Sequence, residues 1–113
     1  MRYNENMFEV LEYLTDAGDS PFSLWVDGLN DAQAVARIDA RVGRLVEGLF
    51  GDCKPVGDGV WELRIDWGPG YRVYYAQSGK LVLLLLCGGD KRHQKADIKR
   101  AMKYWEDWQR RTA

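Results

Sequence analysis

Two arginines, Arg64 and Arg72, are the residues of this chain best placed to do chemistry. They lie in two segments, 60–66 and 71–75, in which apolar and polar side chains alternate. The sequence Gly-Pro-Gly between these segments predicts a β-hairpin, and strand alternation then puts both arginines on one face. Each guanidinium offers a planar fork of donors with a permanent charge. Two of them on one rigid face suit a phosphate group.

The same face of the predicted hairpin has a second interpretation. Glu62 and Tyr74 share the face with the arginines, and Asp66 follows on the first strand. Arg72 can therefore form a cross-strand ion pair with Glu62 or Asp66 that only stabilises a solvated sheet. The sequence leaves the phosphate site and the ion pair equally open.

His93 is the side chain whose unperturbed pKa lies closest to neutrality, which makes it a candidate to move a proton. It lies in a polar stretch next to Lys91, a second candidate acid or base. A nucleophilic pair of Cys87 with His93 is the less favoured interpretation, because Cys87 ends an apolar run and is expected to be buried. One His and two distant Cys supply no metal-ligand set, so we expect no metal and no cofactor.

The charge is divided along the chain, although the whole carries only −1. Residues 1–31 hold seven acids and one Arg, a net −6, and residues 90–113 hold eight Lys or Arg and four acids, a net +4. Basic residues on a terminal helix are most often a solvated surface. The asymmetry nevertheless permits a local phosphate-binding face.

The amino-terminal half predicts a strand followed by two helices. The mixed apolar run 8–14 predicts the strand, and Ser20 with Pro21 predicts the start of a helix that reaches about residue 29. Asn30 is the expected cap of a second helix. Its apolar stripe repeats at steps of three and four: Val35, Ile38, Val42, Leu45 and Leu49.

The carboxy-terminal half predicts a sheet and a last helix. After the hairpin, the apolar run 81–87 predicts a central strand that Gly88 and Gly89 end. Asp90 is the expected cap of the last helix. We therefore predict one α+β domain over 1–113, with a small antiparallel sheet, an N-terminal helical hairpin and a C-terminal helix.

Nothing in the amino-terminal segment resembles an export signal, and the longest apolar run is seven residues. We expect no membrane association. The two cysteines do not have the spacing of a disulfide framework, which favours a reduced, cytoplasmic protein.

Three segments resemble the addiction-module killer proteins, a phage-associated branch of the RelE/ParE superfamily of toxins (RelE/HigB-like). They are GDCKPVGDGVWELRIDWGPGYRVYY (51–75), LVLLLLCGGDKRHQKADIKRA (81–101) and the ending Tyr104-Trp105. The likeness covers about nine-tenths of the chain, and the elements come in the same order. It implies a small sheet carrying helices, and a toxin of a type II toxin–antitoxin system whose RelE-like relatives cut mRNA without metal, commonly in the ribosomal A site.

The resemblance assigns roles by position. It makes Arg64 and Arg72 the holders of transition-state charge, with Lys91 or His93 as acid or base. Further RNA-binding residues expected from it and from the basic tail are Lys54, Arg92, Lys95 and Lys99. The sequence departs from the best-studied RelE pattern in two places. It has Glu62 where that pattern has a second basic residue, and Tyr104 lies deeper in the terminal helix than the catalytic tyrosine.

The resemblance also implies a helix-turn-helix antitoxin as partner and mRNA as substrate. Two other functions stay open. ParE-like members block DNA gyrase by protein contact, and a prophage remnant would bind a partner without cutting anything.

Overall fold

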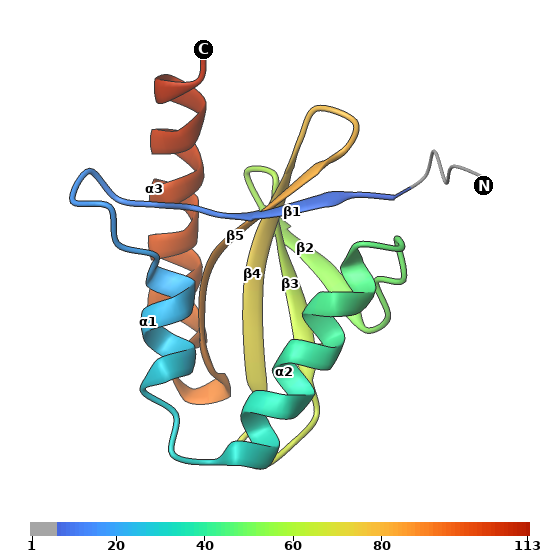
Figure 1. Ribbon diagram of the computed structural model, residues 1–113. Coiled ribbons are helices and arrows are strands. Elements are labelled where there is room, and N and C mark those ends of the chain that lie inside the picture. Colours follow the sequence, from blue (N-terminus) through green and yellow to red (C-terminus); the bar gives the residue numbers. More distant parts are fainter. Residues whose placement is uncertain (1–6) are drawn as a thin grey trace.

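The sheet of this protein combines four antiparallel strands with one parallel strand at its edge. The computed structural model describes residues 7–113 and shows a five-stranded sheet in the order β1-β5-β4-β3-β2 (Figure 1). The strands are β1 (Glu9–Glu12), β2 (Cys53–Gly57), β3 (Val60–Ile65), β4 (Tyr71–Ser78) and β5 (Val82–Asp90). β3 to β5 are antiparallel as predicted. β2, a strand that was not predicted, pairs antiparallel with β3, and β1 pairs parallel with β5, so the sheet is mixed.

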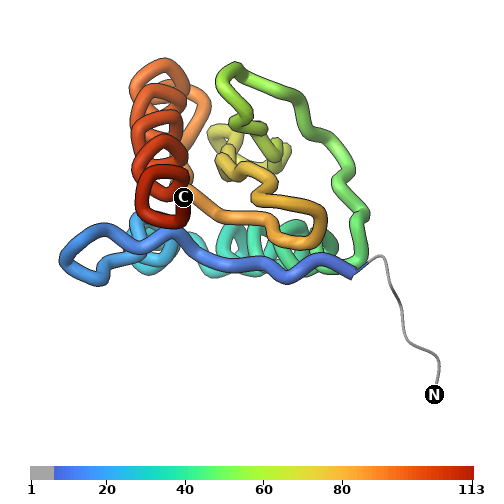
Figure 2. Tube along the Cα trace, turned by 90° about the horizontal axis from the view of Figure 1, so that it is seen from above, coloured from blue at the N-terminus to red at the C-terminus, as the bar shows by residue number. Residues whose placement is uncertain are grey.

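The α+β class, the helical hairpin and the terminal helix are confirmed. The helices are α1 (Pro21–Asp27), α2 (Ala32–Leu45) and α3 (Gln94–Arg111). Seen from above, α1 and α2 lie in one row and α3 stands apart from that row (Figure 2). Within residues 7–113, no helix is both long and apolar enough to cross a membrane.

The helix ends agree with the predictions in part. Ser20 caps α1 by accepting from the Ser23 amide at 3.0 Å, as expected. Asp31, and not Asn30, caps α2, because its carboxylate accepts from two first-turn amides. The apolar stripe predicted for this helix also runs too far, because it includes Leu49 whereas α2 ends at Leu45. Gly48 has a φ of +74°, which ends the helical path, and Leu49 is 56% exposed.

The strand alternation divides the core into two clusters. One cluster lies under α1 and α2 and is centred on Leu63, Val73 and Leu85, all at most 2% exposed. The other lies under α3, where Ala101 and Trp105 pack on the opposite face of the sheet. The β3–β4 register puts Glu62 and the two arginines of the hairpin on this α3 face.

Candidate anion-binding pocket

The β3–β4 hairpin forms with the register that the sequence predicts. Arg64 lies directly opposite Arg72, and Glu62 lies opposite Tyr74. The turn is built by glycines at positive φ, with the Gly70 amide donating to the Trp67 carbonyl at 3.0 Å. The sheet therefore fixes the backbone of both arginines on one face.

Side chains of α2 and of its cap residue Asp31 hold the end of the hairpin. The Trp67 ring nitrogen donates to the Asp31 carboxylate at 3.1 Å, and the Arg37 guanidinium lies 4.0 Å from the Trp67 ring centre. Arg41 donates to the Arg64 carbonyl and to the Phe50 carbonyl, the latter at 3.1 Å. The end of β3 is thus fixed to α2 by side chains as well as by the sheet.

Glu62 is completely buried; it accepts hydrogen bonds from three side chains and forms an ion pair with a fourth, Arg72, whose Nε has no hydrogen-bond partner. Its Oε1 lies 3.1 Å from Arg64 Nε and 3.6 Å from Arg72 Nε. Its Oε2 accepts from the Tyr74 hydroxyl at 3.1 Å and from Gln94 Nε2 at 2.7 Å. Burial, and then the charge of Glu62, raise the pKa of Tyr74 far above its ordinary value, so this hydroxyl stays a donor.

The two arginines and Lys91 line one pocket of about 320 Å³, here called the hairpin pocket. Lys91 comes from the 3₁₀ helix η1 (Lys91–His93), and its amide donates to the Gly70 carbonyl at 2.8 Å. This bond brings η1 against the turn of the hairpin. Asp52, Asp66 and the turn residues 68–70 complete the lining.

The hairpin pocket joins three of the four predicted catalytic residues, and His93 is the one that it leaves out. The His93 ring is 64% exposed, and its Nδ1 lies 2.9 Å from Asp90 Oδ1. The ring lines a different pocket, with Trp25 and Arg100. Partial burial acts to raise the pKa of Asp90, but the hydrogen bonds from His93 and from the Arg92 amide outweigh it and hold that pKa below its ordinary value.

The predicted RNA-binding lysines are exposed. Lys54 pairs in register with Glu62, which puts it on the α3 face beside the arginines. Lys95 and Lys99 precede Met102 by seven and three residues, so they share its flank of α3. Met102 reaches Gly57 of β2, and this flank therefore faces β2 and β3. Arg92 is exposed on η1, 3.6 Å from Asp90.

Asp90 caps η1 and not α3, because its carboxylate accepts from the Arg92 amide and α3 begins four residues later. Gly88 and Gly89, predicted to end the strand, lie inside β5. A Cβ at Gly88 would overlap the Trp25 ring, and a Cβ at Gly89 would overlap the carboxylate of the buried Asp97. The two glycines let α1 and α3 pack closely on β5.

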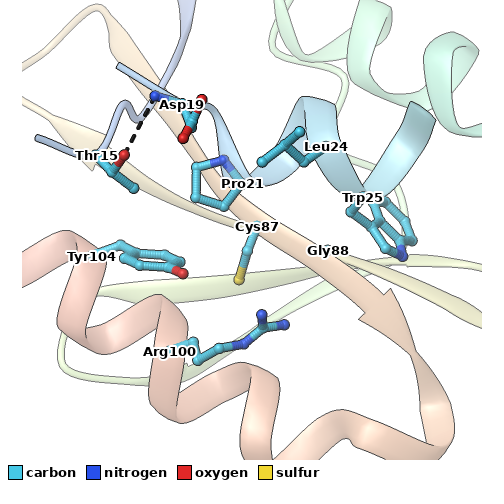
Figure 3. A pocket seen from close by; sticks show the side chains of 9 residues that line it. All are labelled: Thr15, Asp19, Pro21, Leu24, Trp25, Cys87, Gly88, Arg100 and Tyr104. Carbon is cyan, nitrogen blue, oxygen red and sulfur yellow. Dashed lines mark hydrogen bonds between the residues drawn. The ribbon is translucent and has the colours of Figure 1, made fainter. Parts of the chain in front are cut away.

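A second pocket, of about 460 Å³, lies between α1 and α3 (Figure 3). Cys87 lines it together with Arg100 and Tyr104. Tyr104 stacks on Tyr13 with ring centres 4.8 Å apart, which is a packing contact remote from the lining of the hairpin pocket. Burial raises the pKa of Cys87 to about 12, so its thiol stays neutral and is a poor nucleophile.

The raised pKa of Cys87 predicts a loss of stability at alkaline pH. The unfolded thiol releases its proton near its ordinary pKa of 9.0, whereas the folded thiol keeps it up to about 12. The neutral Cys87 thiol therefore contributes its full share to the free energy of unfolding below pH 9. This share is lost as the pH rises toward 12, by at most about 1.4 kcal/mol per pH unit. Urea unfolding at pH 8 to 10.5 measures this slope. Cys87→Ala should reduce the slope, and an unchanged slope in that variant would contradict the assignment.

Sequence reasoning missed the buried contacts around Glu62 and the carboxylates that line the hairpin pocket. Alternation placed Glu62 correctly but gave no sign that it would be buried with two arginines on one oxygen atom. Gln94, Asp52 and Asp66 join the site only through the packing of η1, α3 and the loop before β2. Among residues 7–113, no three His, Cys, Asp or Glu side chains gather to hold a metal ion.

Comparison with known proteins adds a family relationship. No family model matches the chain. The chain is 51% identical over 80 residues to an uncharacterized protein of Haemophilus influenzae, an alignment that covers 71% of this chain and 81% of the relative. Such identity over most of both chains places this protein in the same family as the Haemophilus influenzae protein.

Proposed function

We propose that this protein is the toxin of a type II toxin–antitoxin system, a member of the RelE/ParE superfamily that cuts mRNA in the cytoplasm without a metal. The observation that supports this best is the hairpin pocket, in which Arg64, Arg72 and Lys91 come from β3, β4 and η1 to one place. A phosphodiester is the natural ligand of such a set, because guanidinium forks match its oxygens and ammonium groups attract its charge.

The chemistry proposed for the pocket is attack by the RNA 2′-hydroxyl. The 2′-oxygen forms a bond to phosphorus, the bond from phosphorus to the 5′-oxygen breaks, and a 2′,3′-cyclic phosphate and a 5′-hydroxyl result. Arg64 and Arg72 stabilise the charge of the phosphorane, each by about 3–4 kcal/mol by analogy with an oxyanion-hole donor. Asp52 or Asp66 takes the proton of the 2′-hydroxyl, and Lys91 gives a proton to the leaving 5′-oxygen.

Around the pocket, the exposed lysines extend the same surface. Lys54, Lys95 and Lys99 are exposed on β2 and on the flank of α3 that faces β2. They suit contacts to neighbouring phosphates of the strand, which add affinity without sequence preference.

Cleavage is expected to persist in EDTA and to leave a 2′,3′-cyclic phosphate, because the proposed steps use fixed side-chain cations and no bound metal. The measurement is the cutting of an end-labelled RNA by the purified protein, with the product ends identified by phosphatase and kinase treatment. Activity that disappears in EDTA and returns with magnesium would contradict the metal-free scheme.

The proposed partner is a helix-turn-helix antitoxin encoded next to this chain. The acidic amino-terminal part offers it a docking surface, since Glu9, Asp19 and Asp27 are exposed there. Other acids of this part have internal roles, because Glu12 binds Ser20 and Ser23. A pull-down with the neighbouring gene product tests the proposal, and recovery of nothing would count against it.

A module that binds without cutting is the second candidate, and the pairing of both arginines with Glu62 favours it. In that case the cluster serves only the stability of the sheet. Induction of the chain with and without its neighbouring gene separates the two functions. A toxin stops growth when it is expressed alone, whereas a binding module does not.

A further inference from the structure

We propose that Glu62 is a positioning residue, whose buried carboxylate holds Arg64 and Arg72 so that their terminal nitrogens face the hairpin pocket. This proposal rests on the proposed function, because it assigns Glu62 a part in the same RNA cleavage. It accounts for an acidic residue in the middle of a site for anions.

The contacts show which donors Glu62 uses and which it leaves. Both arginines approach the same Oε1 through Nε, at 3.1 and 3.6 Å. Arg72 donates through one Nη to the Tyr71 carbonyl at 3.2 Å, and within residues 7–113 no hydrogen bond engages the Nη atoms of Arg64. Both Nη atoms of Arg64 and the second Nη of Arg72 therefore stay available to a ligand, while Glu62 holds the Nε side of each guanidinium.

The burial of the cluster makes this anchoring strong. Glu62 is 0% exposed and the Arg72 side chain is only 11% exposed. Tyr74 and Gln94 occupy the second carboxylate oxygen, so the carboxylate cannot turn away from the arginines. Because the anchor fixes the rotamers of the two arginines before the substrate arrives, little side-chain entropy is lost when they align with the phosphorane.

Position and charge predict opposite effects when the charge of Glu62 is removed. If Glu62 acted through its charge alone, Glu62→Gln would strengthen the attraction of the pocket for phosphate and leave kcat unchanged. If position matters, the arginines lose their common anchor and kcat falls although the affinity for RNA does not. A misplacement of about 1 Å is enough to lower a rate about 100-fold.

The test compares Glu62→Gln with the parent and with Glu106→Gln, which makes the same change on an exposed residue of α3. We expect Glu62→Gln to lower kcat about 100-fold with no rise in KM, and Glu106→Gln to match the parent. A kcat for Glu62→Gln within twofold of the parent would overturn the proposal, as would a raised KM with unchanged kcat.

A second readout does not depend on cleavage. In NMR spectra, the Nε–H signals of Arg64 and Arg72 should be separate and protected from exchange in the parent, and should merge with those of exposed arginines in Glu62→Gln. Signals that do not move would overturn the role of Glu62. A parent that cuts no RNA but shows the protected signals would refute the proposed function and leave the anchoring confirmed.

Gln94→Ala keeps the proposal testable if Glu62→Gln does not fold. Gln94 is half-buried in the first turn of α3, its side chain donates to Glu62, and alanine is favourable in helices. Loss of this donor loosens the carboxylate, so we expect kcat to fall about threefold to tenfold with little change in thermal stability. A kcat equal to that of the parent would contradict the role of Glu62.

Discussion

The Arg72→Lys variant is expected to cut RNA at least about 100-fold more slowly than the parent while it keeps its fold. Lysine retains the positive charge that the buried Glu62 requires, so the sheet stays intact. It loses the planar fork that can hold two oxygens of one phosphate. Measurement of kcat/KM on a short RNA, together with thermal unfolding, checks both parts.

Arg44→Lys is the matched control, because Arg44 is exposed on α2 and lies outside the hairpin pocket. It should keep the activity of the parent. If kcat/KM of Arg72→Lys is within twofold of the parent, the planar guanidinium of Arg72 has no part in RNA cleavage. Arg72→Ala is the poorer test, because it also removes a charge partner from a buried carboxylate.

The largest effect on stability is expected from Gly89→Ala. The added methyl group would overlap the carboxylate of Asp97, which is only 4% exposed, so α3 must shift away from β5. We expect a loss of about 3 kcal/mol in the free energy of unfolding, which overpacking of a tight contact produces. Urea unfolding of the variant and the parent measures it.

Gly43→Ala provides the opposite control. Gly43 lies in α2, and a Cβ there meets nothing within 4 Å. Alanine should therefore stabilise the protein by about 0.5–1 kcal/mol through helix propensity. If Gly89→Ala lowers the free energy of unfolding no more than Gly43→Ala does, this result would contradict the close packing of α3 on β5.

The hairpin was predictable because its alternation and its turn are both local signals. Arg64 and Arg72 follow the period of two on either side of a Gly-Pro-Gly turn, and the turn fixes which residues face each other. The helices were predictable for a similar reason, since their apolar stripes repeat within a few residues, but of the three predicted caps only Ser20 was right.

The features that sequence reasoning missed depend on packing between distant segments. β2 has little alternation, and its strand forms because β3 offers it an unpaired edge. Gly88 and Gly89 are usual strand terminators, but here they make room for Trp25 and Asp97. Tertiary contact decides such positions, and local propensity does not.

The candidate site shows the same limit. Strand alternation placed Arg64 and Arg72 on one face, the family resemblance added Lys91, and all three line the hairpin pocket. His93 was placed there because the unperturbed pKa of an imidazole lies near neutrality and because the resemblance includes the basic cluster after the last strand. Successive residues of a tight helix point in different directions, so His93 faces the pocket of Trp25 and Arg100 instead.

The most direct test of RNA cleavage by this protein is to follow macromolecular synthesis after induction of the parent and of Arg72→Lys. With the parent, methionine incorporation should fall before thymidine incorporation, and cellular mRNA should acquire new 5′-hydroxyl ends. With Arg72→Lys, neither change should occur at equal protein level. An early fall of thymidine incorporation with intact mRNA would indicate a gyrase poison, and would contradict cleavage by the hairpin pocket.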